Sequence, residues 1–232
     1  LTDVTGVQTC ALPISGGIVE WTSDAVVPID LDPLNQQGYP NGYDGSMINN
    51  EYGGGSTVTP YKIFSSVNFK MMQDDEPYQI MNAAESEFLK AEALQRGIGS
   101  GISGTVQSHY EAGVKLAMQL YDKYDASLAV TDAQVNQYLA QHPFDAGTAL
   151  EQIGTQMWLS KFMMWWDAWS DWRRTGYPVL VPTNYPGNAT GGTIPRRLIY
   201  PAAEAAGNPN YAATATQPDR LTTKVWWDGG AE

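Results

Sequence analysis

The sequence is poor in the residues that build disulfides, metal sites and membrane spans. Its 232 residues include one cysteine, Cys10, so no disulfide can form within the chain. The two histidines, His109 and His142, are far apart and lack acidic residues at ligand spacing, so we predict no metal site and in particular no catalytic zinc. No apolar run reaches the roughly eighteen residues that a transmembrane helix needs, so we expect no membrane-spanning segment.

Basic residues are also scarce. Thirteen Lys and Arg residues face 25 Asp and Glu residues, which gives a net charge of −12, and no basic residue precedes Lys62. Such a chain repels phosphate backbones, so we expect no nucleic-acid partner. The acidic region before Lys62 is rich in Tyr and Gly and suits neutral or cationic ligands. A solvated loop kept soluble by its charge is an equally good interpretation.

Catalytic motifs are missing as well. No nucleophile-elbow pattern occurs, and the stretch from Gly97 to Gly104 lacks the Lys-Ser/Thr pair of a phosphate-binding loop, so no cofactor is predicted. Two loop carboxylates, Asp44 and Glu51, remain as candidates for a glycosidase, which needs two carboxylates facing each other across a cleft. We therefore expect a protein that is not an enzyme, with a carbohydrate-active hydrolase as the alternative.

Helix signals dominate the middle of the chain, whose hydrophobic share of 43% is typical of a folded globular protein. Capping-box patterns, in which Glu or Gln follows an N-cap residue by three positions, begin helices at Asn82, Thr131 and Thr148. The last helix is ended by Gly176 and Pro178. We predict a mostly α fold with long irregular loops before and after these helices. The expected helices cover residues 82–97, 105–124, 131–142 and 148–174.

A stripe of aromatic residues recurs along the last of these helices. Successive members are four or three residues apart, which places them on one helix face. At this spacing a buried core seam is favoured over a stacking platform for sugar rings. Trp166 lies off the stripe and is the more exposed candidate for ligand binding. The stripe comprises Trp158, Phe162, Trp165, Trp169 and Trp172.

The loop from Tyr39 to Asn50 mixes flat aromatic rings with short amide and carboxylate side chains. Sugar recognition needs both, because rings cover the apolar C–H faces of a sugar while amides and carboxylates bind its hydroxyl groups. A turn-rich loop whose Asn and Asp side chains only satisfy the local backbone is an equally good interpretation. The candidate ligand-binding residues of this loop are Tyr39, Asn41, Tyr43, Asp44 and Asn49.

Two arginine doublets, at 173–174 and 196–197, occur in this acidic chain. Binding of an anionic ligand is one interpretation. We favour a structural role, because forked guanidinium groups pair well with carboxylates such as Asp167, Asp171 or Glu204 and with loop carbonyl groups. The doublets are then expected to tie the last segments of the chain to the helices.

Three blocks close the chain in a recognisable order: WSDWRRTGYP at 169–178, IPRRLIYPAAE at 194–204 and KVWWD at 224–228. Together they resemble the C-terminal signature of the SusD/RagB family, in particular its SusD-like branch. The Glu- and Ala-rich block at 84–93 is similar to a block of that family as well. The resemblance covers residues 32–228 and implies tetratricopeptide-like helix pairs with long ordered loops.

This resemblance implies a non-catalytic nutrient-binding lipoprotein on the surface of the outer membrane of Bacteroidota-type bacteria. Such a protein captures an oligosaccharide, or a peptide, and delivers it to a SusC-like TonB-dependent transporter. A helical scaffold that binds only proteins is a further alternative. The Asp-Pro-Arg that often opens the family's loop is Asp-Pro-Leu at 32–34 here, so the role of that loop is not carried over.

Residues 4–14, VTGVQTCALPI, resemble the conceptual translation of a DNA-sequencing library adapter. We therefore expect residues 1–14 to be non-native, and residues 15–232 to be the C-terminal part of one SusD-like domain truncated at its N-terminus. Cys10 falls in this segment and lacks the basic start and apolar stretch that precede a lipid-bearing cysteine. The lipid anchor is therefore expected outside this chain.

Overall fold

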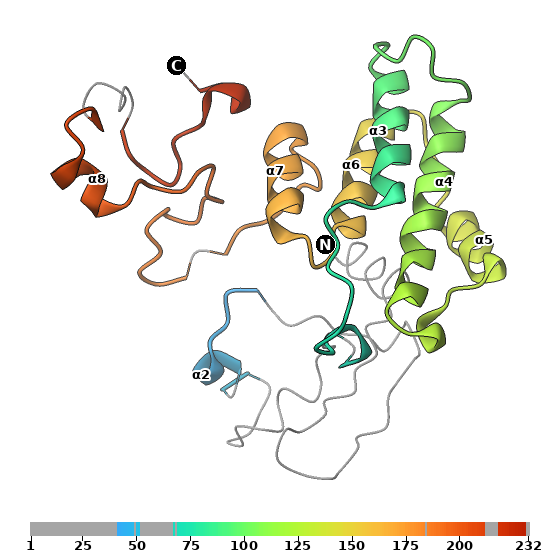
Figure 1. The fold of residues 1–232 in the computed structure, drawn as a ribbon, viewed down its shortest axis with the longest axis horizontal. Coiled ribbons are helices and arrows are strands. Elements are labelled where there is room, and N and C mark those ends of the chain that lie inside the picture. The colour runs from blue at the N-terminus through green and yellow to red at the C-terminus, as the bar shows by residue number, and fades with distance from the viewer. Residues whose placement is uncertain are drawn as a thin grey trace.

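The computed structural model of the chain describes residues 41–48, 50–51, 67, 69–183, 185–211 and 218–230. Every regular element in this part is a helix, which confirms the expected mostly α fold. Helices α3 to α6 pack into one body, α7 lies beside it, and the segment that carries α8 extends away from it (Figure 1). The segment expected to be non-native, 1–14, lies outside the described residues.

The α-helices are α2 (Gly45–Ile48), α3 (Ala83–Gln95), α4 (Val106–Gln119), α5 (Asp132–Gln141), α6 (Ala149–Ser160), α7 (Trp165–Thr175) and α8 (Ala202–Gly207). Short 3₁₀ helices are η4 (Phe69–Met71), η5 (Leu120–Lys123), η6 (Ala126–Leu128) and η7 (Trp226–Asp228). None of these described helices combines the length and the apolar character needed to cross a bilayer.

Side-chain caps begin three of the helices at the predicted positions. Reciprocal capping boxes start α4 at Thr105 and α5 at Thr131. Asn82 caps α3 by accepting a hydrogen bond from the backbone N–H of Glu85 at 2.9 Å. The carboxylate of Glu85 does not complete the expected box, because it accepts a hydrogen bond from the ammonium group of Lys161 at 2.7 Å. A residue predicted for local capping thus serves a long-range contact.

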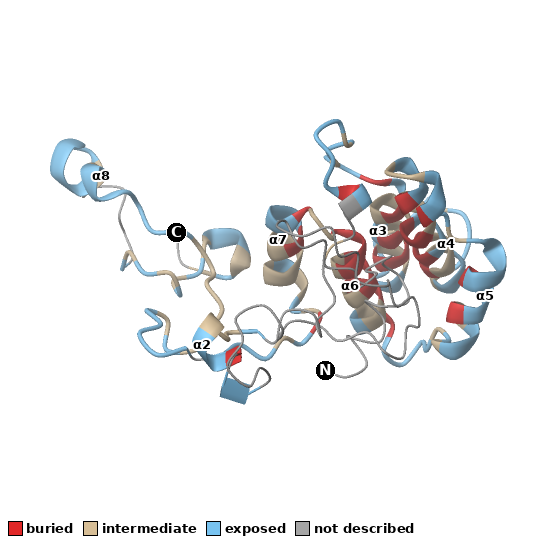
Figure 2. Cartoon of the chain, turned by 90° about the horizontal axis from the view of Figure 1, so that it is seen from below, coloured by how far each residue is buried: buried red, intermediate tan, exposed pale blue. Residues whose placement is uncertain are grey.

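Helices α3, α4 and α6 enclose the main hydrophobic core (Figure 2). Phe88 of α3 is fully buried and lies against Tyr110 of α4, with ring centroids 6.3 Å apart. The helices can approach because Gly113 has no side chain: a Cβ atom there would lie 2.6 Å from the Phe88 ring. Each large apolar side chain buried in this way stabilises the fold by about 1.5–3 kcal/mol. The fully buried large side chains of this core are Phe88, Tyr110, Val114, Val135, Ile153 and Met157.

The prediction of one helix over residues 148–174 is wrong. α6 ends at Ser160, and α7 begins at Trp165. In the turn between them Met163 has a φ of 72°, a left-handed conformation that an α-helix of L-residues does not contain. The aromatic spacing continues across this turn, and for this reason the sequence pattern did not reveal it.

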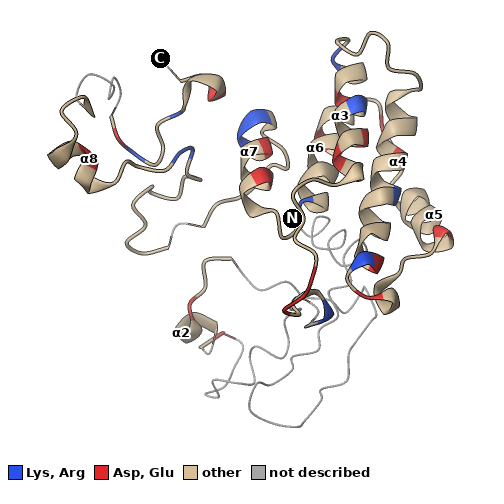
Figure 3. Cartoon of the chain, viewed as in Figure 1, with Lys and Arg blue, Asp and Glu red and all other residues tan. Residues whose placement is uncertain are grey.

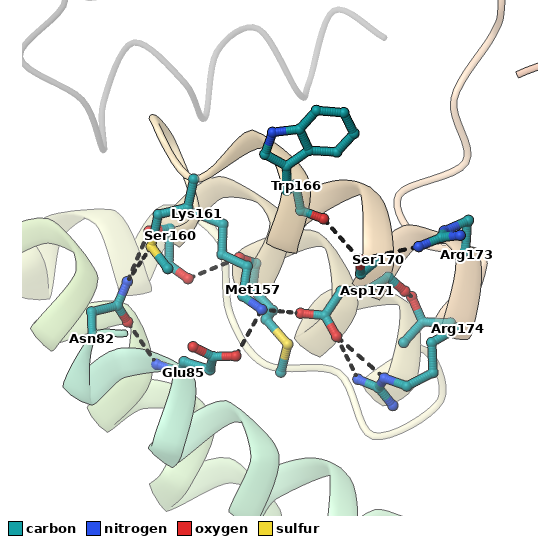
Figure 4. Close-up of polar contacts among 12 residues, drawn as sticks. Asn82, Glu85, Met157, Ser160, Lys161, Trp166, Ser170, Asp171, Arg173 and Arg174 are labelled. Carbon is teal, nitrogen blue, oxygen red and sulfur yellow. Dashed lines mark hydrogen bonds and ion pairs between the residues drawn. The ribbon is translucent and has the colours of Figure 1, made fainter. Parts of the chain in front are cut away.

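Lys161 lies in the turn and joins it to α3 and α7 through its buried ammonium group (Figure 4). The Nζ atom donates hydrogen bonds to Glu85 of α3, at 2.7 Å, and to Asp171 of α7. Asp171 also accepts from Arg174, whose guanidinium group pairs with both oxygens of Glu92 on α3 at 2.6 and 2.8 Å. These mutual contacts offset the cost of removing the charges from water and join the turn to both helices.

Arginines attach the C-terminal segment to α7. Arg196 pairs with Asp228 and donates a hydrogen bond to the backbone carbonyl of Arg173 at 2.8 Å. Arg173 donates in return to the backbone carbonyl of Arg196 at 2.8 Å. The Arg173 guanidinium carbon lies 3.7 Å from the ring centre of Trp169 and 4.6 Å from that of Trp227, close enough for cation–π attraction to both. The geometry agrees with the predicted structural role of both doublets.

The carboxylate partners of the doublets were predicted only in part. Asp171 pairs with the first doublet as expected. Asp167 and Glu204 form no ion pair with an arginine in the described part of the chain, and Asp219 and Asp228 bind the second doublet instead. Figure 3 shows acidic and basic residues together along α7. Asp219 and Asp228 follow their arginines by 22 and 32 residues, a separation at which no local spacing rule applies.

Candidate functional site

Two adjoining cavities open between α6, α7 and the segment that follows α7. Their volumes are about 240 and 660 Å³. The larger value lies within the range of small-ligand sites. Trp158, Leu180 and Ile194 line both cavities, which therefore form one continuous depression, called the groove below.

One wall of the groove carries the aromatic stripe. Trp158 packs against the main core, but the other stripe residues are not part of that core, and 60% of Trp165 is exposed. The prediction of a buried seam is therefore wrong. Because the helix breaks after Ser160, the stripe is divided between α6 and α7, and its rings face an open cavity. The stripe residues lining the smaller cavity are Trp158, Phe162, Trp165, Trp169 and Trp172.

The opposite wall is the apolar segment 178–182, which follows directly after α7. Gly176 ends α7 with a φ of 78°, a conformation that glycine adopts at little cost. Beyond it Val179, Leu180 and Val181 form no backbone hydrogen bond within the described part of the chain. Because Leu180 lines both cavities, this wall combines apolar side chains with amide groups that have no hydrogen-bond partner among the described residues.

Short polar side chains surround the larger cavity, and most of them bind one another. The hydroxyl group of Thr183 donates to the backbone carbonyl of Asn41 at 3.1 Å. The side-chain oxygen of Asn188 accepts from the backbone N–H and the hydroxyl group of Thr190 at 2.8 and 2.7 Å. Thr193 completes this set of polar lining residues. The polar contacts therefore fix the shape of the loop at 183–193.

The structure brings one predicted ligand-binding residue, Asn41, into the groove, where it lines the larger cavity. Tyr43 is half-buried nearby in sequence but is not among the lining residues. Trp166 is 65% exposed, as expected from its position off the stripe, and lies outside the groove with its ring edge-on to Trp169 at 5.8 Å. Two other predicted residues, Tyr39 and Asn49, lie outside the described residues.

Asp44, the remaining predicted residue, is held by the loop at 183–193. Its carboxylate accepts hydrogen bonds from the hydroxyl group of Tyr185 at 2.6 Å and from the backbone N–H of Met47 at 2.9 Å. The Tyr185 contact is the main reason that the pKa of Asp44 lies below its usual value, and it raises the pKa of Tyr185 in turn. A glycosidase acid needs a raised pKa, so Asp44 is unsuited to that role.

The side chains that line the groove are suited to holding a ligand. Among the residues that the structure describes, no three His, Cys, Asp or Glu side chains are placed to hold a metal ion. Aromatic and aliphatic walls can cover the apolar face of a ligand, and amide and hydroxyl groups can fix its orientation. Sequence reasoning missed Leu180, Ile194 and Thr193 as lining residues. The apolar run between Pro178 and Pro182 was the one local signal that marked this wall.

Comparisons with known proteins identify a family and several solved structures that are similar to this chain. Residues 34–201 match a SusD-like family described as starch-binding and associating with the outer membrane. A solved structure named chitin-binding protein is similar to the chain with 34% identity and a TM-score of 0.66. A SusD-like protein of Bacteroidetes AC2a is 29% identical with a TM-score of 0.65, and a SusD homologue from Bacteroides fragilis is 25% identical with a TM-score of 0.65. No curated protein matches the chain.

The matches cover most of this chain but only part of its relatives. They include 72% of this chain and 37% of the chitin-binding protein, and 78% of this chain and 36% of the AC2a protein. For the Bacteroides fragilis homologue the shares are 99% and 51%. The chain thus spans about a third to a half of the length of the solved relatives.

Proposed function

The chain belongs to the SusD-like family, and on this premise we propose that it binds a glycan at the bacterial outer membrane and breaks no bond in it. The observation that carries the proposal is the groove, in which five aromatic side chains of the stripe face a wall of apolar and amide groups. Stacking on rings and hydrogen bonding to amides is the usual way in which proteins hold sugars. The net charge of −12 favours neutral glycans over anionic ones.

The ligand of this function is an oligosaccharide, with a peptide as the alternative. The family description names starch, and one relative is named for chitin, so we consider both glycans as candidates. By the family resemblance, the protein passes its ligand to a SusC-like TonB-dependent transporter and is held at the cell surface by a lipid anchor. The association of the family with the outer membrane supports this location.

The loop residues Tyr39, Asn41, Tyr43, Asp44 and Asn49, together with Trp166, remain proposed contributors to ligand binding. Asn41 has the strongest support, because it lines the larger cavity. Trp166 is supported by its exposure, since a ring that is 65% accessible can stack against a sugar.

A glycan array followed by calorimetry tests the proposal, with the reaction mixtures analysed for released sugars. We expect saturable binding and no products. Released sugars would instead establish the hydrolase, for which Asp44 and Glu51 are the candidate carboxylates. Absence of binding to every glycan and peptide would favour the protein-binding scaffold.

A further inference from the structure

Another cavity lies between α7 and the C-terminal segment, and it is called the arginine cavity below. Its volume is about 470 Å³, and its described lining includes two arginines and no carboxylate. Neither arginine lines the groove, although Trp169 lines both places. The lining residues are Trp169, Arg173, Arg197, Leu198, Ile199, Tyr200, Pro201 and Val225.

Arg173 brings to this cavity a positive charge that has no counter-ion. Its guanidinium group forms no ion pair with any described carboxylate. It donates hydrogen bonds to the backbone carbonyl of Arg196 at 2.8 Å and to the hydroxyl group of Ser170 at 3.2 Å. Its Nε atom is buried without a partner among the described residues. Charges withdrawn from water are usually paired, so an anion is missing here from the described structure.

The surroundings of Arg173 increase the need for such an anion. Burial is the main reason that the pKa of Arg173 lies below its usual value, and the charge of Arg196 lowers the pKa further. The charge of Asp228 raises the pKa but offsets only part of these effects. Arginine nevertheless stays protonated at neutral pH. A negative group bound in the cavity would therefore be attracted by a charge that the fold leaves uncompensated.

Arg197 supplies a second guanidinium group to the same cavity. It pairs with Asp219 at 2.9 Å and donates to the backbone carbonyl of Leu198 at 2.9 Å, which uses two of its five N–H groups. Its guanidinium carbon lies 4.8 Å from the ring centre of Tyr200, much as that of Arg173 lies 3.7 Å from the ring centre of Trp169. Stacking on these rings holds both groups in place, so less entropy is lost when they bind a ligand.

The charge of this part of the chain also suits an anion. Residues 173–230 include six basic and three acidic residues and so carry a net charge of +3, whereas the whole chain carries −12. Exposed charges farther away than about 8 Å are largely screened at physiological salt. A ligand at the arginine cavity is therefore influenced mainly by the local positive charge.

We propose that the arginine cavity is a second binding site, in which Arg173 and Arg197 hold a carboxylate group of a ligand. The two oxygens of a carboxylate match the planar fork of a guanidinium group. Its single negative charge balances the one charge left uncompensated, because Arg197 is already paired with Asp219. The apolar side chains of Leu198 and Ile199 suit an organic ligand better than a small inorganic ion.

A sugar acid and the C-terminus of a peptide both carry this group, and two pairs of probes distinguish them. The first pair is trigalacturonic acid and its methyl ester, and the second is N-acetyl-trialanine and its C-terminal amide. In calorimetric titrations of the chain at fixed ionic strength, we expect one of the acids to bind at least about tenfold more tightly than its neutral counterpart. This advantage should decrease as salt is added.

Two substitutions test the location. Arg173→Gln removes the uncompensated charge, and Ile199→Trp fills the cavity while both arginines stay in place. Each should weaken binding of the preferred acid about tenfold or more. Lys115→Gln is the control for net charge, because it removes one positive charge at a side chain that is 47% exposed. Ile98→Trp is the control for added bulk, since Ile98 is 75% exposed and lines neither the arginine cavity nor the groove.

Each contrary outcome overturns a stated part of the inference. Equal affinity for the acids and their neutral counterparts, or no binding of any acid, overturns the carboxylate site. Tighter binding of inorganic phosphate than of either acid overturns the choice of carboxylate. Unchanged affinity in Ile199→Trp overturns the location, even if Arg173→Gln loosens the C-terminal segment.

This inference goes beyond the proposed glycan binding in the groove and does not depend on it. The two can fail separately, because Arg173 and Arg197 line neither cavity of the groove. Binding of neutral glycans without binding of the acids contradicts only the arginine cavity. Binding of an acid that is lost in Ile199→Trp, without binding of any neutral glycan, supports the arginine cavity and contradicts the proposed function of the groove.

Discussion

Lys161 holds a positive charge almost wholly out of water, with only 4% of its side chain exposed. Burial alone lowers the pKa of this ammonium group, but the hydrogen bonds and charges of Asp171 and Glu85 outweigh burial and raise the pKa overall. Lys161 therefore stays protonated at neutral pH. At the scale of the single residue, it is one of the contacts that join α7 to α3, beside the pair of Arg174 with Glu92.

Replacement of Lys161 by methionine should destabilise the chain by about 3 kcal/mol, because Glu85 is left as a partly buried, uncompensated carboxylate and Asp171 keeps only its pair with Arg174. Urea denaturation followed by circular dichroism measures this loss. Lys123→Met is the matched control: Lys123 pairs with Asp122 but is 69% exposed, so its loss should cost less than about 1 kcal/mol. Equal effects of the two substitutions would contradict the structural role assigned to Lys161.

Glu92 makes the stability of the chain depend on acid. Burial alone raises its pKa, yet the hydrogen bonds and charges of Arg174 and Arg96 outweigh burial and bring the pKa below its usual value of 4.5. A carboxylate whose pKa is lowered on folding contributes stability above its unfolded pKa, and that contribution is lost as the pH falls through the folded pKa. The relevant window thus begins near pH 4.5 and extends downward.

In Glu92→Gln we expect the free energy of unfolding to fall by about 2 kcal/mol at pH 7, since a charged hydrogen-bond partner is lost. We also expect a shallower decline below pH 4.5 than in the wild type. Denaturant titrations at a series of pH values provide the measurement. Asp74→Asn, at an exposed carboxylate without an ion pair in the described structure, should leave the acid dependence unchanged. An identical pH profile for Glu92→Gln and the wild type would refute the assignment.

At the scale of the helix, local signals predicted starts and packing faces well. Thr105 and Thr131 begin their helices as capping rules require, and the faces containing Phe88 and Tyr110 are buried. The break at 161–164 could not be predicted in this way, because the aromatic period runs through it. At the break, Lys161 pairs with Glu85, 76 residues earlier, a contact that no local pattern encodes.

The site was less predictable than the fold, because contacts between residues that are distant in the sequence bring its walls together. Asn41 was recognised as a candidate from its side-chain type. Leu180 and Ile194 were not recognised from the sequence. Whether an apolar residue lines a cavity depends on the segments packed opposite it, which the sequence does not show. The aromatic stripe was found, but its burial depended on whether the helix continued past Ser160.

Met163 offers a direct test of the helix break, because its left-handed conformation, with φ 72°, is costly for any residue except glycine. Met163→Gly should stabilise the chain by about 0.5–1 kcal/mol, as relief of strain exceeds the greater freedom of glycine in the unfolded state. The midpoint of urea unfolding reports the change. Met72→Gly, at an exposed methionine without positive φ, should instead destabilise slightly. A clear loss of stability in Met163→Gly would indicate that residues 148–174 form a continuous helix.

At the scale of the whole molecule, the C-terminal segment stands apart from the helical body. Its large apolar side chains are exposed, including 60% of Leu198 and 68% of Trp226, so it has no core of its own. Its position relative to α7 depends on the arginine contacts, in particular on Arg196 with Asp228, whose side chain is 3% exposed.

Asp228→Asn should release this segment, because the buried guanidinium group of Arg196 loses its charged partner. We expect trypsin to cleave after Arg220 or Lys224 about tenfold faster, since proteolysis follows the population of the opened form. Mass spectrometry of timed digests locates and quantifies the cut. The control, Asp167→Asn, changes an exposed carboxylate of α7 that pairs with no arginine in the described structure and should leave the rate unchanged. An unchanged rate in Asp228→Asn would mean that the aromatic contacts of Arg173 suffice to hold the segment.

Trp158 touches the hydrophobic core on one side and both cavities of the groove on the other. Indole fluorescence shifts toward the blue when water leaves its surroundings. A ligand in the groove dries one face of this indole while leaving the core intact, whereas unfolding exposes the same indole to water on all sides. The fluorescence of Trp158 therefore distinguishes two events: ligand binding in the groove shifts its emission toward the blue, and unfolding shifts it toward the red.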